Sequence, residues 1–280
     1  MVVELFSGMS FVKMYATVSM MVIIWYTLIA GGIYWYLDLT ADEPKYKQFK
    51  TQQSKHKLAT AWNEYRDGVI SSLGTSFNVS LSMYLCSNGL NNMVYNVADM
   101  SLSQHVLSLF GIWLITEVFE WSFHYASHNT KFLWHYHKKH HLYPNPSPLT
   151  VFSDDPLDMW VKSSPMLWIP LLFPVYDVTL FAWFTFVNFI YGVYLHSGYE
   201  PSFLPSRHSK YLVSSWHHNV HHMKNVNGNF GFFTLFLDRI FGTYYGPQQH
   251  QQYQQSQNQR QQSSIGVSTG TNSGEFRVRT

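Results

Sequence analysis

Long apolar runs divide the chain into candidate membrane segments. Residues 14–37 form 24 consecutive positions without a formal charge. At about 1.5 Å per residue, a helix of this length crosses a hydrocarbon core of about 30 Å. Trp35 and Tyr36 lie near one end of the run, where aromatic side chains suit the membrane interface. The pattern predicts a membrane-spanning helix.

Three further stretches extend this layout. Residues 68–98 carry no formal charge, although serines and asparagines interrupt them, and they predict a second span near 69–90. Residues 101–116 predict a third span. Residues 163–176 contain three prolines and measure only about 21 Å as a helix, so we expect them to enter the membrane and turn near Asp177. Residues 178–195 then return to the same side.

The predicted fold is therefore all-α and polytopic, with about three spanning helices, a membrane hairpin and a histidine-rich helical cap. Lysine and arginine number six in the 38–67 loop, four in 123–162 and none in 91–101. If the chain crosses the membrane three times and then forms a hairpin within it, all the basic loops lie on one side of the membrane. The positive-inside rule assigns that side, and the histidines on it, to the cytosol.

Composition removes several other classes of protein. Charged residues make up 12% of the chain, against about 25% in soluble domains, which argues against a soluble globule. The net charge of +2 and the absence of a basic stripe argue against nucleic-acid binding. The single cysteine, Cys86, excludes an all-cysteine metal site.

Three regions follow from these patterns. Residues 1–100 form an N-terminal membrane region that includes the 38–67 loop, and residues 101–246 form a catalytic region. In the remaining segment, 247–280, ten of the fifteen residues 248–262 are glutamine. Because such a composition buries little apolar surface, we expect this tail to be disordered.

Ten of the fifteen histidines fall in the windows 124–141 and 217–222. His124 and His128 are four residues apart, and two H-x-x-H-H patterns follow. Offsets of three and four place side chains on one face of a helix, so each group directs imidazoles toward a common point. We predict the metal ligands to be His124, His128, His137, His140, His141, His218, His221 and His222, with His196 added because it ends the returning helix on the same side.

So many imidazoles exceed the needs of one tetrahedral ion and predict two metals, whose element the ligands leave open. Glu117 and Glu120 share a helix face with His124 and His128. We expect these carboxylates to accept the outer N–H groups of the ligands, the alternative being lysine partners or simple interface positions. His217 lies off the face of His218 and is a candidate for a supporting contact.

Four other histidines are isolated, and His135 faces away from His137 on a helical wheel. None of these is expected to bind metal: His56, His105, His135, His208 and His250.

The spaced histidines resemble the three boxes of the fatty acid hydroxylase/sterol desaturase superfamily of membrane di-iron oxidases. The resemblance covers roughly residues 100–246 and includes Asn188, 196–199, 228–230 and 238–243. It assigns Asn188 a supporting role near the metals. The stretches 196–199 and 238–243 are similar to methylsterol monooxygenases, whereas 145–148 and 153–155 are more like C5-desaturase relatives.

The resemblance implies two non-haem iron ions, O2 as oxidant, and electrons from NAD(P)H through cytochrome b5 and its reductase. It implies residence in the endoplasmic reticulum membrane and a lipid substrate, with sterol C4-methyl oxidation as the first expectation. Sterol C5 desaturation and fatty acyl or sphingolipid hydroxylation are the alternatives. The chain contains no His-Pro-Gly-Gly haem motif and no nucleotide-binding loop, so electrons must come from outside it.

Two other classes are weighed against an oxidase. A zinc hydrolase would favour an H-E-x-x-H motif, which the sequence lacks. A metal transporter would place its ligands near the middle of the membrane on broken helices, whereas these histidines follow the ends of the predicted spans.

Overall fold

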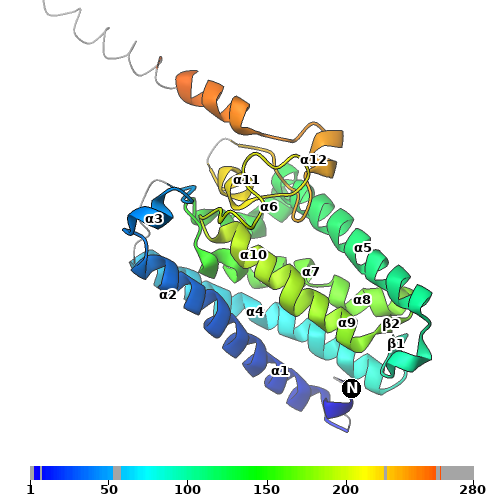
Figure 1. Cartoon of the computed structure of the whole chain (residues 1–280). Coiled ribbons are helices and arrows are strands. Elements are labelled where there is room, and N and C mark those ends of the chain that lie inside the picture. The colour runs from blue at the N-terminus through cyan, green and yellow to red at the C-terminus, as the bar shows by residue number, and fades with distance from the viewer. Residues whose placement is uncertain (1–2, 7, 53–57, 224–225, 257–258, 260–280) are drawn as a thin grey trace, which may run out of the picture. The chain divides into compact units, whose positions relative to one another are not determined.

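The computed structural model describes residues 3–6, 8–52, 58–223, 226–256 and 259. Residues 1–244 form one compact unit and residues 245–280 a second. In the first unit four helices are long and apolar enough to cross a membrane, covering Phe11–Leu39, Ala59–Ser87, Leu102–Asn129 and Asp177–His196 (Figure 1). The expected all-helical membrane fold is confirmed. Lys55, Lys57 and His56 lie outside the described residues.

The first long helix is continuous, but its hydrogen-bonding pattern changes from α to π and back to α. It comprises α1 (Phe11–Tyr26), the π-helical turn η2 (Thr27–Gly31) and α2 (Gly32–Leu39). Met20, Ile24 and Leu28 are at least half exposed along it, as expected of side chains that face lipid. The opposite face, including Met14, Val18 and Tyr26, is buried against α4 (Leu58–Ser87).

Helix α4 carries the serines that lowered the hydropathy of the second predicted span. Ser72 and Ser76 are fully buried, and each donates its hydroxyl to a carbonyl three or four residues earlier. These bonds satisfy the polar groups within the helix itself. The helix packs against α7 (Pro156–Lys162) and α8 (Pro165–Leu172) (Figure 1).

The third long helix, α5 (Leu102–Asn129), runs well past the predicted apolar segment. The Ser101 hydroxyl accepts a hydrogen bond from the Gln104 N–H, and the Gln104 side chain accepts one from the Ser101 N–H, which forms a capping box. The helix then continues through Glu117 and Glu120 to His128 without a break. It therefore carries the first pair of histidines directly out of the predicted span.

The fourth long helix returns from the far end of the unit. It is assembled from α9 (Asp177–Ala182), the π-helical segment η6 (Trp183–Asn188) and α10 (Phe189–His196). As expected, the proline-rich segment before it is short: α8 ends at Leu172, and β2 (Val175–Tyr176) pairs in parallel with β1 (Met93–Val94), with Met93 opposite Val175. This helix ends at His196, beside the histidine-rich segments.

The remaining elements of the first unit are short. They are η1 (Val3–Phe6), α3 (Pro44–Lys47), η3 (Val97–Asp99), α6 (Lys131–His137), η4 (His140–Leu142), η5 (Pro148–Phe152), α11 (Ser215–His221) and α12 (Phe236–Ile240). Among the short elements that carry histidines, α11 begins with a side-chain cap. In α11 the Ser214 hydroxyl accepts from the His217 N–H and donates to Glu200 Oε1 at 2.6 Å.

The second unit contains the segment that the sequence analysis expects to be a disordered tail. Residues 247–256 are helical. Pro247 occupies the first position of this helix, where its missing N–H is no loss, and the Gln249 side chain accepts from the Gly246 N–H at 3.1 Å. Composition alone does not reveal these local signals for the start of a helix. The part of the predicted tail from residue 260 onward lies outside the described residues.

Candidate metal centre

Five separate elements supply the predicted histidines. His124 and His128 lie on α5, His137 ends α6, and His140 and His141 lie in η4. His196 ends α10, while His218 and His221 lie in α11 and His222 is its C-cap. The structure brings all nine together.

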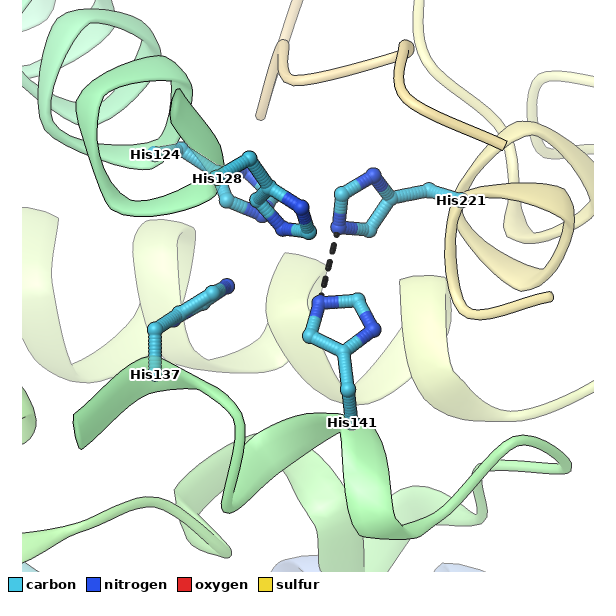
Figure 2. Close-up of side chains that lie close together, drawn as sticks. All are labelled: His124, His128, His137, His141 and His221. Atoms are coloured by element: carbon cyan, nitrogen blue, oxygen red, sulfur yellow. Dashed lines mark hydrogen bonds between the residues drawn. The ribbon is translucent and has the colours of Figure 1, made fainter. Parts of the chain in front are cut away.

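The nine imidazoles divide into two groups, and within each group one nitrogen of every ring lies within 4.8 Å of the others. The first group contains His124, His128, His137, His141 and His221. The second contains His140, His196, His218 and His222. Figure 2 shows the first group directed toward a common centre, with a nitrogen of His141 facing one of His221. Each group offers enough ligands for one ion, as the predicted pair of metals requires.

The outer nitrogens of several rings are held by backbone carbonyls. The Nδ1 atoms of His196 and His221 lie 2.7 Å from Gly192 O and 2.8 Å from Gly228 O. The His124 and His222 Nδ1 atoms lie 3.0 Å from Phe230 O and 3.2 Å from Tyr143 O. A carbonyl only accepts hydrogen bonds, so we assign the proton of each ring to Nδ1. The Nε2 lone pair is then directed inward, as metal binding requires.

Two buried aspartates hold other ligands. Asp158 Oδ2 lies 2.9 Å from His137 Nδ1, and Asp154 Oδ1 lies 3.1 Å from His140 Nδ1, although the latter contact is not aligned as a hydrogen bond. Lys162 Nζ lies 2.9 Å from Asp154 Oδ1 and 3.1 Å from Asp158 Oδ2. One lysine thus joins carboxylates that support both histidine groups.

Burial and nearby charges determine the protonation states of Lys162 and of the grouped histidines. Burial alone would lower the pKa of Lys162, but Asp154 and Asp158 raise it above its ordinary value, so the lysine stays charged. Burial and, to a smaller extent, the nearby Lys162 charge lower the pKa of His221 to about 4, although the hydrogen bond to Gly228 O opposes the shift. Burial also lowers the pKa values of His137, His140, His141, His218 and His222. Neutral imidazole is the form that binds metal.

The hydrogen-bond partners of the inner nitrogens show whether the site fits metal ions. The buried Nε2 atoms of His124, His128 and His137 have no hydrogen-bond partner among the described residues. His196 Nε2 lies 3.3 Å from His140 Nε2 and 2.9 Å from His218 Nε2, while its own proton is assigned to Nδ1. Buried lone pairs without donors are costly unless a cation sits between them. The donor set therefore fits two imidazole-bound ions.

The predicted supporting residues take different positions from those expected. Glu117 accepts from the Phe233 and Thr234 N–H groups at 3.2 and 3.0 Å, which fixes the segment after Phe230 instead of a ligand imidazole. Asn188 donates to Glu120 Oε1 at 3.0 Å, and this pair lines a cavity beside the histidines.

His217 belongs to neither histidine group. Its Nδ1 accepts from the Ser214 N–H at 3.2 Å and completes the capping box of α11. His105, His135, His208 and His250 are also outside the two groups, in agreement with the sequence analysis.

Asp154, Asp158 and Lys162 were not among the predicted site residues. The sequence spacing could have indicated part of this arrangement, since Asp158 and Lys162 are four residues apart and form an ion pair on α7. The partnership with His137 and His140 depends on how α7 packs, which local spacing does not encode.

A largely apolar cavity of about 130 Å³ borders one side of the centre. His124, His140 and His196 line it together with Phe123, Phe184 and Phe189. An apolar groove of about 290 Å³ between α1, α4 and η6 shares Thr75, Phe152, Met166, Phe184 and Phe189 with it. Because Met21, which also lines the groove, is half exposed on a predicted span, this side of the centre communicates with the lipid-facing surface.

A second, more open groove of about 790 Å³ borders other ligands. His128, His141 and His221 line it, together with Trp134, Lys138 and Lys139. None of these residues lines the apolar cavity. The centre is therefore approached from two distinct cavities, one apolar and one bordered by lysines.

Comparison with known proteins agrees with this geometry. Residues 109–243 match the fatty acid hydroxylase family. The superfamily expected from the histidine boxes is thereby supported, and all nine grouped histidines lie in the fatty acid hydroxylase region. No solved structure gives a significant match.

Several curated relatives are named as sterol-modifying enzymes. The chain is 34% identical over 138 residues to a Delta(7)-sterol 5(6)-desaturase of Eremothecium gossypii, which covers 49% of this chain and 35% of that protein. It is 32% identical over 124 residues to the desaturase of the same name from Leptosphaeria maculans, covering 44% and 33%. It is 28% identical over 146 residues to human lathosterol oxidase, covering 52% and 48%. The matches thus span half or less of each relative.

These names support the alternative reaction better than the first expectation. The sequence analysis favoured sterol C4-methyl oxidation on the basis of residues 196–199 and 238–243. Two of these relatives instead carry the name of the alternative, sterol C5 desaturation.

Proposed function

We propose that the protein is a membrane di-iron oxidase that introduces the 5,6 double bond into a Δ7-sterol. The observation that carries the proposal is the pair of buried histidine groups beside an apolar cavity, within a region similar to named 5(6)-desaturases. The groups supply only imidazole ligands, which suit iron. The relatives support a sterol as substrate.

The reaction balances with one O2 and two external electrons. Two hydrogens leave adjacent carbons of the sterol, two electrons and two protons are added, and O2 becomes two waters. Unactivated carbon–hydrogen bonds are beyond the reach of amino-acid side chains, so the bound irons would supply the redox chemistry. His124, His128, His137, His141 and His221 would hold one ion, and His140, His196, His218 and His222 the other.

The chain's own residues would position the substrate. The apolar groove and cavity admit a flat hydrocarbon skeleton from the lipid side, and Phe184 and Phe189 line both. The Glu120–Asn188 pair places polar atoms in the cavity wall beside its aromatic side chains, where a hydroxyl of the sterol can hydrogen-bond. Exclusion of water by the aromatic wall would protect reactive species from side reactions.

The cellular setting completes the proposal. We place the protein in the endoplasmic reticulum membrane with the metal centre on the cytosolic side, following the distribution of basic residues and the resemblance to the superfamily. Electrons would come from NAD(P)H through cytochrome b5 and its reductase.

The test is sterol profiling in cells that lack their own sterol 5(6)-desaturase. Expression of this chain is expected to convert accumulated Δ7-sterols into products with a 5,6 double bond, whereas its His218→Ala variant is expected to convert none. A parallel strain that lacks 4-methylsterol oxidase tests the earlier expectation. Loss of 4-methylsterols there, with unchanged Δ7-sterols in the first strain, would overturn the proposal.

A further inference from the structure

Helix α6 presents an unusual exposed face next to the metal ligands. Residues at offsets of three, four and seven lie on the same side of a helix. In α6 and its C-cap these positions are all exposed, and they form what we term the α6 face: Lys131, Trp134, His135 and Lys138. The face combines basic groups with a large aromatic ring.

Trp134 connects this face to the first histidine group. Its ring centroid lies 5.2 Å from that of His128, 5.6 Å from that of His141 and 6.3 Å from that of His137. At the same time 36% of the residue is exposed. A single aromatic side chain therefore reaches from solvent to three of the grouped imidazoles.

The surroundings of the face are basic and apolar. Lys138, His135 and Trp134 line the open groove beside His128 and His141, and Lys139 lines it as well. Lys139 lies 3.9 Å from Asp67, and the one carboxylate lining the groove, Asp155, caps α7 by accepting from the Leu157 N–H. Lys131 and Lys138 form no ion pair with the described residues.

Exposed apolar side chains flank the lysines. Phe132 is 69% exposed and Leu142 is 67% exposed. Protein interfaces combine large apolar or aromatic residues at the centre with a charged rim. The α6 face has this composition, and its charge is complementary to an acidic partner.

We propose that the α6 face is the docking surface for an acidic one-electron carrier protein and that Trp134 conducts the electrons to the first histidine group. This inference rests on the proposed function, because an O2-dependent desaturation consumes two electrons that the chain itself does not supply. Two carrier molecules are each oxidised by one electron in every turnover. Electron transfer weakens steeply with distance, so a ring in contact with the imidazoles shortens the gap.

The location also separates the two reactants. The sterol side of the centre is the apolar cavity, which includes His124, His140 and His196. The α6 face approaches through the other groove, at His128, His141 and His221. A carrier docked on α6 therefore leaves the sterol side free.

Binding is tested first, with the metal-free full-length protein in lipid nanodiscs and the soluble haem domain of cytochrome b5 as probe. The Lys131→Glu/Lys138→Glu variant is expected to weaken binding about tenfold and to flatten its salt dependence, because opposite charges at the rim become like charges. Lys210→Glu changes an exposed lysine at a different cavity and is the matched control. Equal binding of the probe by the Lys131→Glu/Lys138→Glu and Lys210→Glu variants would overturn the proposal that the α6 face is the docking surface.

Electron transfer is tested separately, with iron-loaded protein and the prereduced probe, followed by haem absorbance. With the probe at a concentration that saturates binding, Trp134→Leu is expected to slow oxidation of the probe about tenfold at equal iron content. Trp134→Phe retains a ring and is expected to slow it less. An unchanged rate in Trp134→Leu at equal iron content would overturn the role of Trp134.

A chemical reductant separates this inference from the proposed function. With dithionite in place of the probe, the Lys131→Glu/Lys138→Glu variant is expected to desaturate a Δ7-sterol at the wild-type rate. If no variant, the wild type included, oxidises a sterol with dithionite, the proposed function fails. The binding and electron-transfer results still decide the docking surface in that case.

Discussion

At the scale of single residues, five of the nine grouped histidines are held at the outer nitrogen, Nδ1, while the inner nitrogen is directed into the group. The carbonyls of Gly192, Gly228 and Phe230 act on different rings in the same manner. The metal therefore meets imidazoles whose tautomer and direction are already set. Loss of one ring should release the ion that it helps to bind.

The first prediction concerns His218, which belongs to the second histidine group. His218→Ala is expected to lower the iron content from two ions per chain toward one and to abolish sterol oxidation. Elemental analysis of purified protein measures the change. His208→Ala removes an exposed histidine outside both groups and should retain two ions. A full complement of iron in His218→Ala would contradict the assignment.

The second prediction concerns Lys162, which neutralises Asp154 and Asp158. Lys162→Met leaves two buried carboxylates without their partner, and we expect it to destabilise the protein by about 3–5 kcal/mol. Metal affinity should fall roughly 10- to 100-fold, since the aspartates orient His137 and His140. Thermal unfolding and metal titration measure both effects. In Asp154→Asn/Lys162→Met part of the stability should return, and purely additive losses would argue against the charge explanation.

At the scale of elements, the position of α7 depends on a glycine in α4. A Cβ atom at Gly74 would lie 2.7 Å from Pro156 O and 2.9 Å from Trp160 N, both backbone atoms of α7. The two helices can approach this closely only where α4 lacks a side chain. Since α7 carries Asp158 and Lys162, its displacement would disturb the metal centre.

The third prediction compares two glycines. Gly74→Ala is expected to reduce the thermal stability and the metal affinity of the protein, because the α4–α7 contact must open. Gly32→Ala introduces the same methyl group where nothing lies within 4 Å, and a higher helix propensity should make it neutral or slightly stabilising, by up to about 1 kcal/mol. Equal effects in the two variants would show that the close contact is unimportant.

The fourth prediction concerns helix α11 and pH. Burial lowers the pKa values of His217 and His221 to about 4, below the value near 6.5 of an unfolded chain. Between these values the unfolded state binds more protons, so stability falls as pH falls. The metal-free protein is expected to keep its full stability above about pH 6.5 and to lose it progressively toward pH 4. Chemical unfolding at stepped pH values measures this, and a stability that rises on acidification would contradict it.

The sequence predicted some features of these helices and missed others, and the difference has a physical reason. Helical spacing places His124 and His128 on one face of α5, and both belong to the first group. The second and third boxes instead divide between the two groups, which the spacing within one box does not predict. The same reasoning wrongly led us to expect Glu117 to support a histidine, although its helix face was identified correctly. Glu117 meets the Phe233 and Thr234 backbone, and such a contact between segments more than 100 residues apart is set by tertiary packing alone.

At the scale of the whole molecule, the first unit contains two approaches to one metal centre. The number of long apolar helices and their order were largely predictable, because bilayer thickness fixes the length of a spanning segment. The cavities were not predictable, because residues from α1, α4, η6 and η5 combine to form them. Substrate preference depends on this combined wall.

The fifth prediction tests that wall through Phe184, which lines both the apolar cavity and the lipid-side groove. Phe184→Trp enlarges a side chain at their junction and is expected to raise the KM for the sterol about tenfold, with little change in iron content. Phe203→Trp, at a residue that is 84% exposed, is the control. Steady-state kinetics measure the effect, and an unchanged KM would indicate that the substrate does not pass this junction.

The division of ligands between the two histidine groups has a consequence for biosynthesis. His221 belongs to the first group, and His218 and His222 to the second, so neither set is complete until α11 has been translated. The ribosome must reach beyond residue 222 before either ion can find its full shell. The nascent chain would therefore enter the bilayer without a complete metal shell, and a product terminated before α11 would lack both complete sites even if the four long apolar helices had inserted correctly.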